Sequence, residues 1–453
     1  MKKFLCILGL MVFVNLFMTV HAVDNINKAI ANSKVKKDTI SISVKDIETG
    51  KSVYELNQNR LISPASTQKI VTLAAAIDTL GPTYNFETSL YKNTNNELFL
   101  KLGADPYLRE KDLTSLMNQA KAKKILEPKN IYIDDYIVDS VEWGEGWQWD
   151  DDLNSLMPKF GSYNLDGNLL YIFVAPTNNG APANVYSKFF YPVTFMNLAL
   201  TDESKANNIT FERNNSISPD ILTVKGSVSK IQYYTVPVPN LKRYFRLRLE
   251  DAIKDAKIEY YGKISQKKLP SDNVYLVASI KHPIKIAVGD ILKNSNNMAA
   301  ESVFKIAGGK YVNNTGSIAA AIKMFEAFCK KIGVNSDEIK IVDGSGVSKN
   351  NLMSADFMTN YLVALSQIPG FDLYKSILPT AGEGTLANRM LYFKDNLRAK
   401  TGTLADISAI TGYLTSKSGK TYAFDIMIND AKTSPSDKKM LEEYILRAVY
   451  NYY

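Results

Sequence analysis

The segment Pro64-Ala65-Ser66-Thr67-Gln68-Lys69 leads directly into the apolar run Ile70-Val71-Thr72-Leu73-Ala74-Ala75-Ala76-Ile77. The run ends before Gly81-Pro82, so the pattern predicts a buried helix that begins near Thr67. A serine and a lysine three positions apart lie one turn apart on the same helix face. In this setting Lys69 can act as the base that activates Ser66 as a nucleophile. The alternative is that Ser66 only caps the helix and Lys69 reaches solvent.

The S-x-x-K pattern by itself is weak evidence, because it recurs along the chain. Of the instances at Ser33, Ser66, Ser227, Ser265 and Ser436, only the one at Ser66 follows a proline-containing turn and opens an apolar helix. Burial at such a helix start would lower the pKa of Lys69 until the amine can accept a proton. Ser66 and Lys69 are therefore the first candidate pair, and further motifs must decide between catalysis and capping.

The first 22 of the 453 residues have the pattern of a secretory signal peptide. Lys2 and Lys3 precede an apolar stretch over residues 4–18, and Val20-His21-Ala22 is a suitable cleavage site. This pattern predicts export to the periplasm; a retained membrane anchor is the alternative. Cleavage would change the formal net charge from +8 to 8 − 2 = +6 and leave one cysteine, Cys329, and therefore no internal disulfide.

One histidine, His282, remains in the predicted mature chain. Zinc sites built from clustered histidine and cysteine are excluded, and a Ser-His-Asp triad would have to use His282. Because His282 precedes Pro283 in a charged segment, we expect it to be solvated. If the protein is a hydrolase, we therefore expect a base other than histidine, a role that lysine can fill, and we expect no metal and no cofactor.

The positive charge is spread along the chain without the dense basic runs of a nucleic-acid binder, so we expect no nucleic-acid partner. The last helix, expected from about Asp437 to Val449, has one apolar side, which is typical of a helix that covers a sheet. Peripheral contact of this helix with a membrane is the alternative. At the other end of the chain, alternating residues predict a hairpin from Thr39–Lys45 and Ser52–Leu56.

Two further motifs lie in the C-terminal half. S-x-N occurs at Ser162, Ser271, Ser295 and Ser348, but only Ser295-Asn296-Asn297 lies between two apolar helices, expected at 284–292 and 298–307. Lys400-Thr401-Gly402-Thr403 occurs once, before strands expected at 407–414 and 422–428. Lysine and hydroxyl groups on an edge strand can hold a carboxylate, and glycine lets a substrate backbone approach. The alternative is an ordinary strand.

The order S-x-x-K, S-x-N, K-T-G resembles that of the penicillin-binding proteins and serine β-lactamases. Two segments narrow the resemblance to the penicillin-binding protein 4 type of D-alanyl-D-alanine carboxypeptidase/endopeptidase, in class C of the low-molecular-mass group. They are Asp343-Gly344-Ser345-Gly346-Val347-Ser348 and Ala381-Gly382-Glu383-Gly384-Thr385-Leu386. The long separation of Ser66 from Ser295 also fits, because that family inserts a domain between them. The departures are Asn296, where aspartate is commoner, and a slightly shortened loop at Glu383.

The resemblance implies an α/β (α+β) fold. A penicillin-binding/β-lactamase-like catalytic domain would hold a central antiparallel sheet flanked by helices, and a large mixed α/β domain would be inserted into it. The expected boundaries are 1–22 for the signal peptide, 23–102 and 275–453 for the discontinuous catalytic domain, and 103–274 for the insertion.

The resemblance also implies roles for the motif residues in acyl transfer on a D-Ala-D-Ala peptide. Ser66 would attack the penultimate carbonyl and Lys69 accept its proton, while the positive charge of Lys400 lowers the pKa of Lys69. Ser295 and Lys400 would relay a proton to the leaving amine, and Asn297 would bind the acyl amide. The terminal carboxylate would be held by the K-T-G segment, namely Lys400, Thr401, Gly402 and Thr403.

The implied partners are peptidoglycan stem peptides as substrates and β-lactam antibiotics as covalent inhibitors. One alternative is a non-enzymatic peptidoglycan-binding or scaffolding protein with a relic site. Another is a β-lactamase, whose usual size leaves no room for the inserted block. All three tryptophans lie within Trp143 to Trp149, which fits either a platform for glycan or peptide or a loop packed by its aromatic residues.

Overall fold

The computed structural model describes residues 21–187 and 191–453. The predicted signal peptide lies outside the described residues except for His21 and Ala22, which belong to a helix over residues 21–31. Ala22 is buried in this helix, so the predicted cleavage point falls inside it. Within the described ranges, no helix combines the length and the apolar character needed to cross a membrane.

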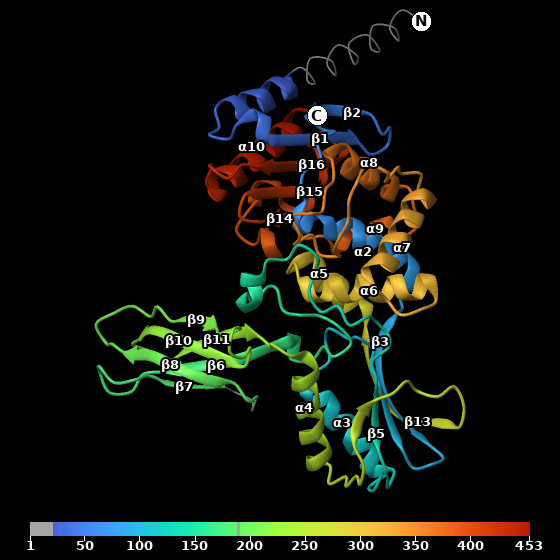
Figure 1. Ribbon diagram of the computed structural model, residues 1–453. Helices are drawn as coiled ribbons and strands as arrows, with labels where there is room; N and C mark the ends of the chain where they lie inside the picture. The colour runs from blue at the N-terminus through green and yellow to red at the C-terminus, as the bar shows by residue number, and fades with distance from the viewer. Residues whose placement is uncertain (1–20, 188–190) are drawn as a thin grey trace, which may run out of the picture.

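A five-stranded antiparallel sheet forms the centre of the larger part of the molecule (Figure 1). Its order is β14-β15-β16-β1-β2, and β14 (Leu397–Thr403) is an edge strand. The pairing of β1 with β16 places an early strand of the chain beside a late one. The expected hairpin and final strands are confirmed as β1 (Ile40–Asp46), β2 (Ser52–Leu56), β15 (Ile407–Thr415) and β16 (Thr421–Asn429).

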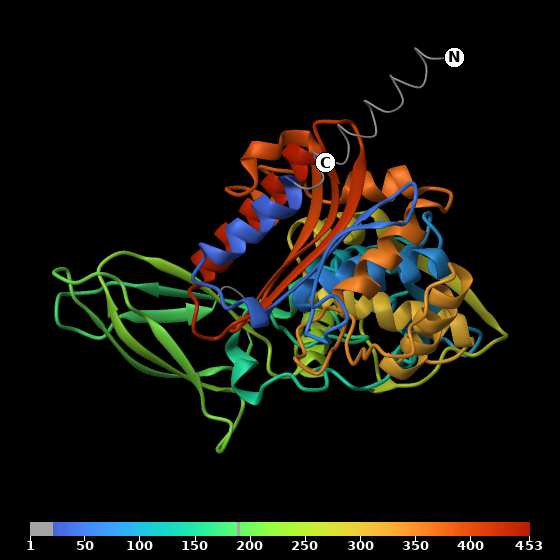
Figure 2. The ribbon, with the colours of Figure 1, turned by 90° about the horizontal axis from the view of Figure 1, so that it is seen from above.

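Helices cover both faces of this sheet (Figure 2). On one face α10 (Pro435–Tyr452) and the helix over residues 21–31 lie side by side, and Ile26 and Ile445 are buried between them and the sheet. The other face carries a cluster of helices around one apolar core. These helices, which include the expected ones, are α2 (Gln68–Leu80), α5 (Ile284–Lys293), α6 (Asn297–Val312), α7 (Ile318–Lys331), α8 (Ala355–Ser366) and α9 (Phe371–Ile377).

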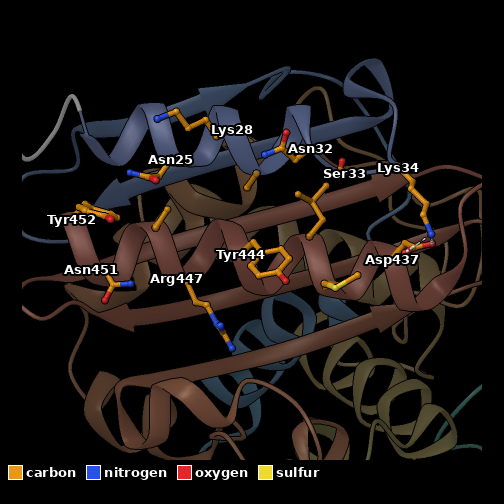
Figure 3. A pocket seen from close by; sticks show the side chains of 14 residues that line it. Asn25, Lys28, Asn32, Ser33, Lys34, Asp437, Tyr444, Arg447, Asn451 and Tyr452 are labelled. Carbon is orange, nitrogen blue, oxygen red and sulfur yellow. Dashed lines mark hydrogen bonds and ion pairs between the residues drawn. The ribbon is translucent and has the colours of Figure 1, made fainter.

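A groove runs between α10 and the helix over residues 21–31 (Figure 3). Lys28, Asn32 and Arg447 are among the polar side chains that line it, and Lys34 forms an ion pair with Asp437 at one end. The groove lies on the sheet face opposite α2, and no residue of the three sequence motifs lines it. It is therefore separate from the candidate chemistry.

The inserted part of the molecule contains a second, mixed sheet of order β12-β5-β4-β3-β13 and a projecting arm of two three-stranded sheets (Figure 1). The arm sheets have the orders β8-β10-β9 and β11-β6-β7, and their inner faces share one apolar core with α3 and α4. The elements are β3 (Asn85–Asn93), β4 (Leu98–Lys101), α3 (Glu110–Ala122), β5 (Ile131–Asp134), β6 (Leu169–Ala175), β7 (Asn184–Ser187), β8 (Thr194–Thr201), β9 (Thr210–Arg213), β10 (Ile221–Val228), β11 (Gln232–Pro237), α4 (Leu241–Asp255), β12 (Ile264–Gln266) and β13 (Val274–Pro283).

The pairing of the mixed sheet bears on where the insertion begins and ends. β3 and β4 precede residue 103 and most of β13 follows residue 274, yet all three strands pair within the same sheet as β5 and β12. Asn85 lies opposite Pro283, so the chain enters and leaves the sheet at neighbouring positions. We propose on this basis that the insertion spans residues 85–283, wider than the expected 103–274.

Short 3-10 turns connect several of these elements. The turn that matters for the motifs joins the β2 side of the sheet to α2 and contains Ser66. The 3-10 turns are η1 (Lys37–Thr39), η2 (Ala65–Thr67), η3 (Trp149–Leu153), η4 (Asp166–Asn168), η5 (Gly384–Leu386) and η6 (Leu391–Asn396).

The central sheet contains a fully buried carboxyl group. Asp425 lies on β16 with Thr411 opposite it on β15, and the Thr411 hydroxyl donates a hydrogen bond to Asp425 Oδ1. Burial raises the pKa of Asp425 to about 8. Between about pH 4 and pH 8 the native carboxyl therefore keeps a proton that the unfolded chain has lost, so ionisation lowers folding stability as the pH rises through this window.

We expect Asp425→Asn to remove this pH dependence, because the amide does not ionise. The difference in the free energy of unfolding between the variant and the unsubstituted protein should shift in favour of the variant by a few kcal/mol between pH 4 and pH 8. The reason is that one pKa unit corresponds to about 1.4 kcal/mol. Urea unfolding at a series of pH values measures the difference. The exposed Asp372→Asn serves as the control, and a difference independent of pH would contradict the assignment.

Candidate active site

Ser66 and Lys69 lie where the turn η2 (Ala65–Thr67) runs into α2. Lys69 is fully buried and its Nζ donates a hydrogen bond of 2.8 Å to Ser66 Oγ. Neither feature of the capping alternative is present, because Lys69 does not reach solvent and the start of α2 has no side-chain cap. The two groups thus have the geometry of a nucleophile and its base.

The Lys69 amine has two further acceptors inside the protein. Its Nζ donates to Asn297 Oδ1 at 2.7 Å and to the carbonyl oxygen of Ser345 at 2.6 Å. Burial lowers the pKa of Lys69 to about 7, against the opposing effect of the negative charges of Asp343 and Glu301. Near neutral pH a substantial fraction of the amine is therefore unprotonated and can accept a proton.

Glu301 and Asp343 form the buried support beneath Lys69. The Glu301 carboxylate accepts hydrogen bonds from the backbone nitrogens of Gly344 at 2.9 Å and Ser345 at 2.8 Å. Asp343 accepts from the backbone nitrogen of Ser348 at 2.7 Å. Burial, with the nearby charge of Asp343, raises the pKa of Glu301. These contacts fix the segment that presents the Ser345 carbonyl to Lys69.

Lys400 and Ser295 form the second pair of the site. Lys400 is fully buried on β14, and its Nζ donates to Ser295 Oγ at 3.0 Å and to the Thr401 carbonyl at 2.8 Å. Burial and the positive charge of Lys69 hold the pKa of Lys400 well below its usual value. The expected repulsion between the two lysines is therefore present, and burial is the largest cause of the lowered pKa of Lys69.

Asn297 links the two pairs, because it lies two residues after Ser295 in the chain and its Oδ1 accepts a hydrogen bond from Lys69 Nζ. Its amide nitrogen Nδ2 donates to the carbonyl oxygen of Leu156 at 2.8 Å. Leu156 belongs to the inserted part and follows the turn η3, so a loop of the insertion reaches the site. Sequence reasoning did not identify this contact, since a backbone carbonyl leaves no signal in residue type.

The K-T-G segment runs beside the turn that holds Ser66. A Cβ atom at Gly402 would approach the Pro64 carbonyl oxygen to 2.8 Å and the Ser66 nitrogen to 3.1 Å, so glycine allows β14 to pass close to η2. Thr401 Oγ1 donates to Thr385 Oγ1 at 2.7 Å, and Thr403 is exposed at the end of the strand. Thr385 comes from the second segment of the family resemblance, for which the sequence suggested no individual role.

Two more S-x-x-K patterns occur, from Ser89 to Lys92 in β3 and from Ser302 to Lys305 inside α6. Ser302 Oγ accepts from Asn164 Nδ2 at 2.9 Å, whereas Lys305 Nζ donates to Asp139 at 2.6 Å and to the Val141 carbonyl at 2.6 Å. The serine and the lysine therefore have separate partners, and only the Ser66 pair has a hydrogen bond between them among the interactions described here.

The remaining sequence candidates have no described hydrogen bond to Ser66, Lys69 or Lys400. Trp147 is buried against Phe160 and donates from Nε1 to Asp343 at 2.9 Å, as in the packed-loop alternative, whereas Trp149 is 81% exposed. The expectation that His282 is solvated is wrong. Its Nδ1 lies 2.6 Å from Asp105 Oδ2, because the buried Asp105 carboxylate requires a partner.

Comparison with known proteins finds relatives over nearly the whole chain. The D-Ala-D-Ala carboxypeptidase 3 (S13) family matches residues 22–448. The D-alanyl-D-alanine carboxypeptidase DacB of Haemophilus influenzae is 24% identical over 453 residues, which cover 95% of this chain and 93% of that protein. A D-alanyl-D-alanine carboxypeptidase of Actinomadura is 26% identical, over 87% of this chain and 78% of that protein.

Solved structures of similar fold also cover nearly the whole chain. The crystal structure of penicillin binding protein 4 (dacB) from Haemophilus influenzae superposes with a TM-score of 0.82 at 23% identity, over 94% of this chain and 98% of that one. The same protein complexed with a β-lactam superposes with a TM-score of 0.78 at 22% identity, over 94% and 99%. The expected fold class, with a helix-flanked antiparallel sheet and an additional mixed α/β part, is confirmed.

Proposed function

Because the chain belongs to the D-Ala-D-Ala carboxypeptidase 3 (S13) family, as its motifs indicated, we propose that it acts on peptidoglycan stem peptides through an acyl-enzyme on Ser66. It is a serine peptidase and a D-Ala-D-Ala carboxypeptidase. The observation that carries the proposal is the 2.8 Å hydrogen bond between Ser66 Oγ and the buried amine of Lys69. A serine this close to a desolvated lysine has a base of which a substantial fraction is unprotonated near neutral pH.

In the acylation step Ser66 Oγ attacks the carbonyl carbon of the penultimate D-alanine, and Lys69 takes the hydroxyl proton. The backbone N–H groups of Ser66 and Thr403 stabilise the negative charge on the carbonyl oxygen. The peptide C–N bond then breaks, and the leaving amine receives a proton from Ser295 Oγ, which is replenished through its hydrogen bond with Lys400. D-alanine leaves and the shortened peptide stays as an ester on Ser66.

The terminal carboxylate of the substrate lies against the K-T-G segment. Lys400 supplies positive charge there, and the Thr403 hydroxyl supplies a neutral donor. The Thr401 hydroxyl donates to Thr385 in this structure and turns from Thr385 to the carboxylate when the substrate binds. Lys400 and Thr401 are buried and Thr403 is exposed, so Thr403 contacts the carboxylate from the open side of the site. Gly402 has no side chain between this strand and the Ser66 turn.

Asn297 Nδ2 binds the amide carbonyl of the acyl portion of the substrate. That donor is engaged by the Leu156 carbonyl in this structure. The substrate carbonyl therefore takes the place of Leu156, and the loop after η3 shifts away from Asn297 when the peptide binds. Because the substrate carbonyl replaces the Leu156 carbonyl, Asn297 Nδ2 keeps a hydrogen-bond partner, and this limits the free-energy cost of breaking the bond to Leu156.

Water then hydrolyses the ester and releases the shortened peptide. Penicillin also forms an ester on Ser66, by opening of its β-lactam ring, but the leaving nitrogen stays tethered to the acyl group. The acyl-enzyme therefore persists, and β-lactams act as covalent inhibitors. Cleavage of cross-links uses the same chemistry on a larger substrate, so we propose endopeptidase activity too. The predicted signal peptide supports a periplasmic location for the enzyme.

The test is to assay the purified mature protein with a pentapeptide that ends in D-Ala-D-Ala. We expect release of D-alanine and, with benzylpenicillin, an intact mass increased by one penicillin. A pentapeptide that ends in L-alanine is the control and should not be cleaved. Labelling without release of D-alanine or cleavage of cross-linked muropeptides would favour the non-enzymatic binding role, and absence of both would contradict the proposal.

A further inference from the structure

The connection between α5 and α6 consists of three residues, Asn294 to Asn296, and it carries the catalytic candidate Ser295. Ser295 has φ of 63°, in the left-handed region that residues other than glycine rarely adopt. Such a backbone conformation persists only where the surroundings hold it in place.

Asp290, in the last turn of α5, is the group on which the connection converges. Its Oδ1 accepts from Asn294 Nδ2 at 2.9 Å, and its Oδ2 accepts from Asn296 Nδ2 at 2.7 Å. The backbone carbonyl of Asp290 also accepts from the backbone nitrogen of Asn294 at 3.0 Å. The residues on both sides of Ser295 are thus hydrogen-bonded to one aspartate.

Asn296 uses both ends of its amide. Oδ1 accepts from the backbone nitrogen of Ala299 at 2.9 Å and so caps α6, while Nδ2 donates to Asp290. An aspartate at 296, the commoner residue of this motif, could cap the helix equally well. It could not donate to Asp290, and two carboxylates would lie at hydrogen-bond distance. Asn296 therefore complements Asp290, because its amide can donate a hydrogen bond to the Asp290 carboxylate.

A residue of the inserted part completes this cluster. Tyr107 Oη donates to Asp290 Oδ2 at 2.9 Å. The Tyr107 backbone is fixed in turn, because its nitrogen donates to Asp105 Oδ1 at 2.8 Å and Asp105 Oδ2 pairs with His282. The contact thus links the insertion to the end of α5.

We propose that Asp290 is a positioning residue of the reaction. Through Asn296 it holds Ser295 against Lys400 and Asn297 against Lys69, and through Tyr107 it ties this arrangement to the inserted part. The inference rests on the proposed function, since it assigns Asp290 an effect on acylation. Asp290 itself touches neither Ser66 nor either catalytic lysine in the described contacts, so it acts through the residues that it holds, Asn294 and Asn296.

The experiment compares Asn296→Asp, Asp290→Asn and the double variant that exchanges the two residues. Asn296→Asp should slow acylation by fluorescent penicillin about 10- to 100-fold, since it places two carboxylates together, and Asp290→Asn about 3- to 10-fold. The double variant restores one donor and one carboxylate with the same net charge, so its rate should return to within about threefold of the unsubstituted protein. Tyr107→Phe should slow acylation only about 2- to 5-fold.

Hydrogen exchange of the peptide over residues 290–300 supplies a readout that does not depend on activity. Exchange should be faster in Asn296→Asp and return to the original rate in the double variant. Unchanged exchange in Asn296→Asp, or a double variant as slow in acylation as Asn296→Asp, would overturn the inference. If the unsubstituted protein is not acylated, the proposed function fails, and hydrogen exchange still decides whether Asp290 positions the connection.

Discussion

The Ser66→Ala variant is expected to lose covalent labelling by penicillin and to release D-alanine at least about 10⁴-fold more slowly than the unsubstituted protein. The reason is that alanine has no atom that can form the ester, and removal of a catalytic nucleophile leaves only binding and oxyanion stabilisation. The measurements are the intact mass after exposure to benzylpenicillin and the rate of D-alanine release from a D-Ala-D-Ala pentapeptide.

Ser63→Ala is the matched control for this variant. Ser63 is a buried serine three residues earlier, and its hydroxyl has no hydrogen-bond partner among the described residues. Its substitution should therefore leave labelling and D-alanine release unchanged. In Ser66→Ala the Lys69 amine keeps Asn297 and the Ser345 carbonyl as acceptors, so the fold should be retained. Equal labelling of Ser66→Ala and the unsubstituted protein would contradict the nucleophile assignment.

The parts of the site that follow helical or strand periodicity could be predicted from sequence. Ser66 and Lys69 lie within one helical turn, so their contact follows from spacing once the helix is assigned. The burial of Lys69 also follows, because the residues after it are almost all apolar. Ser295 could be chosen over other S-x-N serines because two apolar helices flank it.

The long-range contacts could not be predicted, since they depend on how separate segments pack. Glu301 was visible as a charged residue in an apolar helix, but its hydrogen bonds to the 344–345 backbone required the structure. The Leu156 carbonyl carries no residue-type signal at all. The pairing of β3 with β13 joins strands some 190 residues apart, and no local pattern indicates which distant strand a strand pairs with.

Substitution of the base is the second variant with a large expected effect. Lys69→Arg should slow acylation by penicillin about 10²- to 10⁴-fold, the range that a general base contributes. Arginine keeps the positive charge and the donors but stays protonated at all working pH values, so it cannot accept the Ser66 proton. The second-order rate of acylation by fluorescent penicillin measures the loss.

The pH dependence of the unsubstituted protein gives an independent test of the same assignment. Because burial lowers the pKa of Lys69 to about 7, the reactive unprotonated amine increases about tenfold per pH unit below that value and saturates above it. The acylation rate should therefore rise with pH from 5 to about 7 and then level off. A flat profile over this range, or a rise centred near the ordinary lysine pKa, would contradict Lys69 as the base.

Lys438→Arg separates loss of the base from a general effect of arginine at a buried lysine. Lys438 is buried in α10 on the other face of the sheet, where its Nζ donates to the carbonyls of Asp406 at 3.0 Å and Asp430 at 2.7 Å. Arginine can donate to both carbonyls, and no step of the reaction uses them. In Lys438→Arg the acylation rate should be unchanged, and the midpoint of its pH profile should stay near pH 7. An equal loss of acylation rate in Lys438→Arg and Lys69→Arg would mean that the effect at Lys69 arises from packing and not from proton transfer.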